Sequence, residues 1–122
     1  MMDRYNTSKE KRKSPRFSMD FPLEYRFLNV PNAYGGIVVD GSEIGLRIHS
    51  VKNMAVGMRL NITVIFPKEF QMANFEVVAE IIWKETYSTS NWDGYQYGLK
   101  FVMIKEDDLL KLQKLLSEQY RI

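Results

Sequence analysis

The chain has 122 residues, of which 45% are hydrophobic and 26% are charged, as is ordinary for one globular domain with a modest core. It contains no cysteine and a single histidine, His49, which excludes a disulfide framework, a thiolate metal site and a His-rich metal site. No apolar stretch approaches the roughly 18 residues of a membrane span, and no apolar segment follows the N-terminal charges as in a secretory signal. We therefore expect a cytoplasmic protein of bacterial style that does not associate with membranes.

Charge is unevenly distributed along the chain. Residues 1–16 contain six Lys or Arg against two Asp or Glu, a net charge of +4, whereas the remainder carries −2. We therefore expect a flexible basic N-terminal arm over residues 1–16, followed by one slightly acidic domain over residues 17–122. Such arms usually stay solvated or bind an anion.

Six stretches have the alternating or short apolar pattern that predicts strands. They cover residues 17–27, 36–40, 45–49, 58–66, 75–83 and 95–103. Pro22 falls on the polar face of the first stretch, which predicts an edge strand or a bulge. By composition we expect a short loop at residues 41–45, a connector at 67–74 and a polar loop at 88–94.

The end of the chain changes period. Leu109, Leu112 and Leu116 recur at helical spacing, and residues 106–108 place carboxylates where the first turn of a helix favours them, so we expect a helix over about 106–119. No helix is expected between strands, so the sheet should be antiparallel. Strands of this number and length bury one shared face best as a barrel. The predicted fold is therefore a six-stranded antiparallel β-barrel with a C-terminal helix over one opening.

Several large side chains are interpreted as packing residues. Met19, Met58 and Met103 lie on alternating apolar faces and are expected to fill the core. Trp83 and Trp92 are expected mainly to pack in the core and in a loop.

The arm contains an RxxxR pattern formed by Arg12 and Arg16, with Lys11 and Lys13 beside the first arginine. Pro15 disfavours a helix here, so both arginines are expected on a stiff, extended segment. Guanidinium groups offer forked donors that match phosphate oxygens and the O6/N7 edge of guanine. This pattern favours a phosphorylated or guanine-containing ligand.

A second pattern, DxSxxG, lies between two predicted strands and consists of Asp40, Ser42 and Gly45. Gly41 and Gly45 can supply positive φ or a close backbone approach. A carboxylate can accept hydrogen bonds from the N1–H and amine of guanine, and a serine hydroxyl can donate or accept. Together the two patterns describe a site for a guanine nucleotide with phosphates.

On these motifs the chain resembles the PilZ domain family, the bacterial receptor module for cyclic di-GMP. Matching positions are Arg12 and Arg16 in the first motif and Asp40, Ser42 and Gly45 in the second. The segment YGLKF, with Gly98 and Phe101, is similar to the glycine-then-phenylalanine strand that precedes the family's terminal helix. The resemblance covers most of the chain and implies a six-stranded antiparallel barrel with a terminal helix.

The resemblance also implies a mechanism. The arm would be mobile until cyclic di-GMP binds, and would then fold over the barrel so that Arg12 and Arg16 hold guanine and phosphate against Asp40 and Ser42. The ordered arm would present a new surface to a downstream protein partner, with an output such as motility or exopolysaccharide production. No cofactor beyond this ligand is implied, and the receptor could be a monomer or a homodimer.

Three positions refine this expectation. Lys11 occupies a place where many relatives have arginine, which bears on whether one ligand or an intercalated pair is bound. Trp83 ends its strand where some relatives place an aromatic residue beside the guanine. Gly41 is smaller than the apolar residue that usually follows the aspartate.

Other interpretations remain open at the level of sequence. The arm could be a solubilising tail, and Asp40 and Ser42 could simply form a turn. The domain could be a partner-docking module that binds no ligand. Small barrels also bind nucleic acids, although the net negative charge outside the arm argues against a long polyanion.

Catalysis is not expected. Asp40, Ser42 and His49 are the residue types of a triad, but a triad is defined by geometry, and no metal set or phosphate-binding P-loop is present. We interpret His49 as a strand-end residue whose hydrogen bonds are satisfied.

Overall fold

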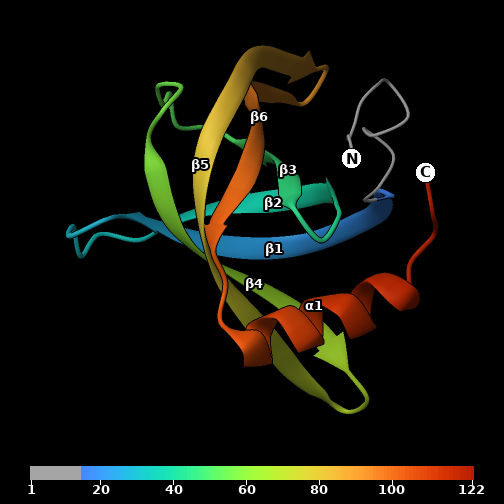
Figure 1. Cartoon of the computed structure of the whole chain (residues 1–122). Coiled ribbons are helices and arrows are strands. Elements are labelled where there is room, and N and C mark those ends of the chain that lie inside the picture. Colours follow the sequence, from blue (N-terminus) through green and yellow to red (C-terminus); the bar gives the residue numbers. More distant parts are fainter. Residues whose placement is uncertain (1–14) are drawn as a thin grey trace, which may run out of the picture.

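The computed structural model describes residues 15–122, which form six strands and one helix (Figure 1). The elements are β1 (Phe17–Phe27), β2 (Tyr34–Gly41), β3 (Gly45–Ser50), β4 (Arg59–Lys68), β5 (Gln71–Thr89), β6 (Trp92–Met103) and α1 (Glu106–Ser117). The strands pair antiparallel in the order β1-β2-β3-β6-β5-β4, and β4 pairs with β1 to close the barrel. The predicted fold is confirmed.

Pro22 is itself in register, opposite Ile37, and follows a bulge in β1 rather than lying in it. The pairing of β1 with β2 shifts register between Ser18 and Phe21, directly before Pro22. β1 is not an edge strand, because β4 pairs with its other side from Leu23 onward.

The last strands are longer than the hydrophobic pattern indicates. The predicted connector at 67–74 is wrong, because β4 runs to Lys68 and β5 begins at Gln71. The predicted loop at 88–94 is also wrong, because β5 continues to Thr89 and β6 starts at Trp92. No side chain of β5 is buried from Ile82 to Thr89, so no apolar alternation marks this part of the strand.

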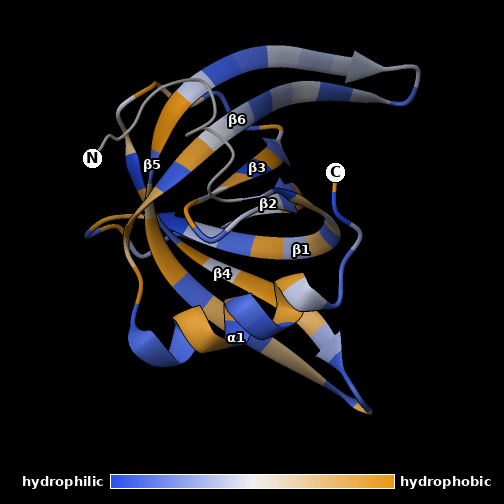
Figure 2. Ribbon diagram, turned by 45° about the vertical axis from the view of Figure 1, so that its right-hand side comes forward, coloured by the Kyte–Doolittle hydropathy of each residue, from blue (hydrophilic) through white to orange (hydrophobic). Residues whose placement is uncertain are grey.

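Buried hydrophobic side chains from all six strands form the core. Figure 2 shows hydrophobic residues alternating with hydrophilic ones along the strands. Met19 is buried and Met58 packs against the core, but Met103 is 60% exposed, so its assignment to the core is wrong. Tyr25 and Tyr97 are fully buried with their hydroxyl groups paired. Burial raises the pKa of both phenols above the ordinary value.

Helix α1 lies across one end of the barrel, as expected from its apolar stripe (Figure 1). It ends at Ser117, two residues before the predicted end, and buries Leu112, Leu115 and Leu116. The Asp108 carboxylate in its first turn accepts a hydrogen bond of 3.1 Å from the backbone N–H of Glu76 on β5. Across residues 15–122, no helix has the length and apolarity needed to cross a bilayer.

Candidate ligand-binding site

One row of residues crosses four neighbouring strands on the outside of the barrel. Asp40 on β2 pairs with Arg47 on β3, Arg47 pairs with Gly98 on β6, and Gly98 pairs with Trp83 on β5. Side chains at paired positions of adjacent strands project from the same face of a sheet. The row therefore places a carboxylate, a guanidinium, a bare glycine and an indole side by side.

Asp40 is the buried centre of an ion cluster, with only 1% of its surface exposed. Its Oδ1 accepts hydrogen bonds from Nε and Nη2 of Arg16, at 2.9 and 2.6 Å. Its Oδ2 forms an ion pair with Nη2 of Arg47. A buried carboxylate is strongly disfavoured unless it is paired, so the two arginines account for how Asp40 is tolerated here.

The two guanidinium groups keep donor capacity toward solvent. The Arg16 and Arg47 side chains are 42% and 39% exposed although both contact Asp40. Nε of Arg47 is buried and has no hydrogen-bond partner among residues 15–122. Guanidinium N–H groups that reach solvent are donors suited to the oxygens of an anion.

Trp83 lies directly over Gly98. A Cβ atom at Gly98 would fall 2.0 Å from Nε1 of Trp83, so the indole occupies the space that any other residue would need. Trp83 is 38% exposed and is not part of the core, so its interpretation as a core residue is wrong. Its exposed surface borders the arginine cluster and is available for a planar ring to stack on.

These side chains line one cavity of about 430 Å³, which falls within the usual range of small-molecule sites. The cavity is lined by Arg16, Asp40, Leu46, Arg47, Ile82, Trp83, Gly98, Leu99 and Ile122. Of the residues expected from the sequence, it brings together Arg16, Asp40 and Trp83. Arg12, Lys11 and Lys13 lie outside the described residues.

Ser42, Gly45 and Gly41 shape the β2–β3 turn and do not line the cavity. The Ser42 N–H donates to the Gly45 carbonyl at 2.9 Å, and the Ser42 hydroxyl accepts a hydrogen bond of 3.2 Å from the N–H of Ile44. A Cβ atom at Gly45 would fall 2.2 Å from the carbonyl oxygen of Leu99, so β3 and β6 approach each other closely there. The DxSxxG segment thus positions Asp40 opposite Arg47.

Gly41 and Gly45 allow neighbouring atoms to pack close to the backbone of this turn, and neither has an unusual backbone angle. Gly57 is the one glycine with positive φ among the described residues, so neither Gly41 nor Gly45 has it. A Cβ atom at Gly41 would fall 2.7 Å from Cδ2 of Leu46, so a larger residue here would require the Leu46 side chain to move.

Sequence reasoning missed Arg47, Gly98 and Ile122 as lining residues. The β2–β3 hairpin offered a signal for Arg47, because opposite charges that flank a short turn tend to face each other across it. Ile122 had no comparable signal. It reaches the site because its N–H donates to the Arg16 carbonyl at 2.9 Å, while the N–H of Ser18 donates to the Tyr120 carbonyl at 2.7 Å.

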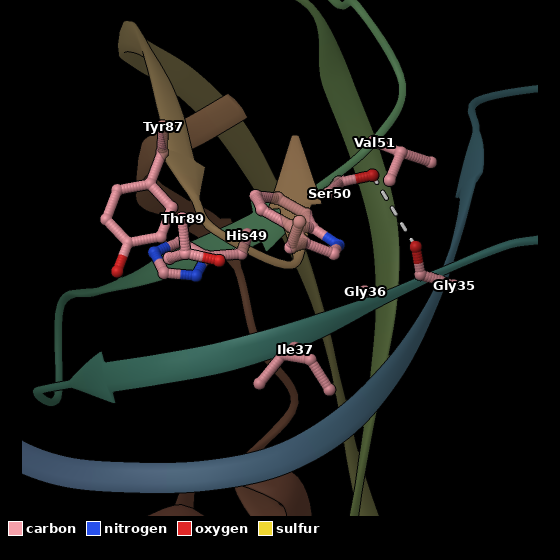
Figure 3. A pocket seen from close by; sticks show the side chains of 9 residues that line it. Gly35, Gly36, Ile37, His49, Ser50, Val51, Tyr87 and Thr89 are labelled. Atoms are coloured by element: carbon pink, nitrogen blue, oxygen red, sulfur yellow. Dashed lines mark hydrogen bonds between the residues drawn. The ribbon is translucent and has the colours of Figure 1, made fainter. Parts of the chain in front are cut away.

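His49 lies at the far end of β3, beside a second cavity of about 340 Å³ (Figure 3). Its Nε2 is 2.8 Å from Oε1 of Gln96, whose amide donates to Glu85 at 2.9 Å. His49 therefore contacts neither Ser42 nor Asp40, and the three form no triad. Within residues 15–122, no group of three or more His, Cys, Asp or Glu side chains is placed to hold a metal ion.

Solved structures with a similar fold include three bacterial proteins. The PilZ domain with c-di-GMP of YcgR from Escherichia coli has a TM-score of 0.70 and 15% identity, over 89% of this chain and 91% of that one. The K. pneumonia MrkH–c-di-GMP complex has a TM-score of 0.71 and 18% identity, over 88% and 50%. MotI/DgrA, the inhibitor of motility of Bacillus subtilis, has a TM-score of 0.69 and 13% identity, over 88% and 49%. The chain thus spans about half the length of the last two proteins.

No protein of curated function matches this sequence. The PilZ domain family matches residues 10–118, a range that contains both motifs and every strand of the barrel. The chain belongs to the PilZ domain family.

Proposed function

We propose that the cavity around Asp40 binds cyclic di-GMP and that the protein is a receptor without catalytic output. One observation carries this proposal: Arg16 and Arg47 flank the buried Asp40 in a cavity that Trp83 also lines. Two supporting facts come from relatives, since the YcgR PilZ domain and MrkH were both solved with c-di-GMP.

The site chemistry matches a guanine dinucleotide at three points. Arginine donors suit phosphate oxygens and also the O6/N7 edge of guanine. The Asp40 side chain is only 2% exposed, so we propose that the ligand displaces one of the two arginines and that the freed carboxylate oxygen accepts a base N–H. The exposed surface of Trp83 suits stacking of a purine ring.

Charge supports the same ligand. Arg16, Arg47 and Asp40 together carry +1, and the neighbouring Lys11, Arg12 and Lys13 add three positive charges in the sequence. The two phosphodiester groups of cyclic di-GMP carry two negative charges. We propose that Arg12 joins Arg16 on the bound ligand, with Lys11 and Lys13 close to the phosphates.

The proposed signal is a change in the surface around the arm. Arg16 pairs through its side chain with Asp40 and through its carbonyl with Ile122, so a ligand that repositions Arg16 acts on both segments. On ligand binding the N-terminal arm that precedes Arg16 would fold against the barrel and present a surface to a downstream protein. Hydrogen exchange with and without ligand tests this, with slower exchange expected in residues 1–16 and 120–122.

Isothermal titration tests ligand identity. Cyclic di-GMP is expected to bind, whereas cyclic di-AMP and GTP at the same concentrations bind weakly or not at all. Arg16→Ala and Asp40→Ala are each expected to lower affinity tenfold or more, because each loses a charge-assisted contact of about 1.5–3 kcal/mol.

Arg59→Ala is the matched control, because Arg59 forms an exposed ion pair with Glu80 and does not line the cavity. Equal heats for wild type, Arg16→Ala and Asp40→Ala would overturn the site assignment. Absence of heat with all three nucleotides would favour the ligand-free docking module. Binding of oligonucleotides that collapses steeply with salt would favour a nucleic-acid binder.

A further inference from the structure

β5 and β6 continue past the end of β4 as a segment that we call the β5–β6 arm (residues 82–98; Figure 1), in which β3 still pairs with β6 from Tyr95 to Gly98. β4 pairs with β5 only as far as Arg59 opposite Glu80. The backbone of Ile81 then bonds to Gly57 and Met58 in the β3–β4 connection. From Ile82 to Thr89, no strand within residues 15–122 pairs with this side of β5.

The register shows which backbone groups are left free. Thr89 pairs with Trp92 across a two-residue turn, so these two residues exchange both backbone hydrogen bonds. The alternation then directs the N–H and C=O groups of Lys84, Thr86 and Ser88 away from β6. We call these groups the open edge.

The open edge lacks the usual protection against strand pairing. Natural edges carry prolines, bulges or several lysines. The β5–β6 arm has no proline, and its one bulge, between Ile81 and Trp83, comes before the open edge, so the register is unbroken from Trp83–Gly98 to Thr89–Trp92. Its one edge lysine, Lys84, has its amine bonded to the Asn53 side chain.

Aromatic stacking holds the β5–β6 arm against the barrel. The ring of His49 lies 4.3 Å from that of Tyr87, at an interplanar angle of 28° (Figure 3). The ring of Trp92, which belongs to β6, also stacks on His49, with the ring centroids 5.7 Å apart. An isolated hairpin is only marginally stable, but here β3 pairs with β6 from Tyr95 to Gly98, and together with the aromatic stack this pairing holds the β5–β6 arm in place as a preformed edge.

We infer that the open edge pairs with the same edge of a second copy of this chain, antiparallel about a two-fold axis at Thr86. The edge is complementary to itself in this register. Lys84 faces Ser88 of the second copy, Glu85 faces Tyr87, and Thr86 faces Thr86, so no like charges meet. All three residues of the open edge then exchange backbone hydrogen bonds, and the two arms form a four-stranded sheet, as a closed two-fold interface requires.

A single-cysteine experiment tests the pairing directly, because the chain has no cysteine of its own. Directly paired residues of this kind lie about 5.5 Å apart between Cα atoms, which suits a disulfide. Thr86→Cys is expected to give a covalent dimer on mild oxidation. Gln71→Cys, at a position that is also exposed but lies at the other end of β5, is the control and should remain largely monomeric.

Sedimentation velocity over a concentration series gives the second readout. The wild type should dimerise with rising concentration, whereas Thr86→Pro and Thr86→Lys should remain monomeric. Proline removes an outward N–H without touching the β5–β6 ladder, and lysine places like charges on the axis. Circular dichroism and thermal melting check that both variants fold.

The pairing is overturned if the wild type is monomeric throughout, or if either folded variant dimerises as the wild type does. Equal cross-linking at Thr86→Cys and Gln71→Cys would also overturn it. None of these outcomes depends on cyclic di-GMP, so they are separate from the test of the ligand.

Discussion

Replacing Arg47 with methionine tests whether the buried carboxylate of Asp40 needs both guanidinium groups. Arg16 supplies both donors to Oδ1, at 2.9 and 2.6 Å, whereas Arg47 pairs with Oδ2. Methionine keeps an unbranched stem but removes the donor. A buried charged acceptor that loses its partner costs about 1–3 kcal/mol, and each kcal/mol lowers Tm by about 3–5 °C in a chain of this size.

The assay is urea unfolding of a double-mutant cycle built from Arg47→Met and Asp40→Asn. Because the two residues are in direct contact, we expect a coupling free energy of about 1–2 kcal/mol. Arg59→Met is the matched control, since the Arg59–Glu80 pair at 3.2 Å is at the surface and should cost less than about 1 kcal/mol. Additive single variants, with Arg47→Met no more costly than Arg59→Met, would refute the role given to Arg47.

Three further predictions follow from the packing. Gly98→Ala should displace the indole of Trp83, because the new Cβ would fall 2.0 Å from Nε1. We expect a red-shifted tryptophan emission and weaker nucleotide binding, and an unchanged emission spectrum would contradict this. Gly45→Ala should lower the free energy of unfolding by about 1–3 kcal/mol, since its Cβ would meet a backbone oxygen at 2.2 Å, whereas Gly35→Ala, with nothing within 4 Å, should be nearly neutral. Burial raises the pKa of Tyr25 and Tyr97, so the folded state keeps their protons to higher pH than the unfolded state, and their contribution to stability should be fully present below pH 10 and be lost as pH rises above it. Thermal melting from pH 8 to 11 measures this, and Tyr97→Phe should flatten the alkaline decline.

The strands that line the core could be predicted, because burial of one face imposes a period of two on the sequence. β1 shows this most directly, with the same bounds in the sequence pattern and in the structure. The outer part of β5 could not be predicted in this way. None of its side chains from Ile82 to Thr89 is buried, so no apolar alternation distinguishes it from a loop.

The residues of the candidate site also differ in whether they could be predicted from the sequence. Arg16 and Asp40 could be predicted from chemistry and motif spacing, because residue type alone shows what ligand they suit. The contributions of Arg47 and Gly98 depend on strand register, which joins residues far apart in the chain.

The sequence by itself thus determined the antiparallel barrel, its terminal helix and the kind of ligand that the motif residues can bind. Only the tertiary structure decided that Arg47 completes the pairing of Asp40, that Trp83 lies on Gly98, and that an open edge extends along β5. The physical reason is that burial of one face requires apolar residues at every second position, which can be read within each strand alone. Which residues are neighbours across the sheet depends on how strands that are distant in the sequence align. The same alignment decides which backbone N–H and C=O groups are left without a hydrogen-bond partner.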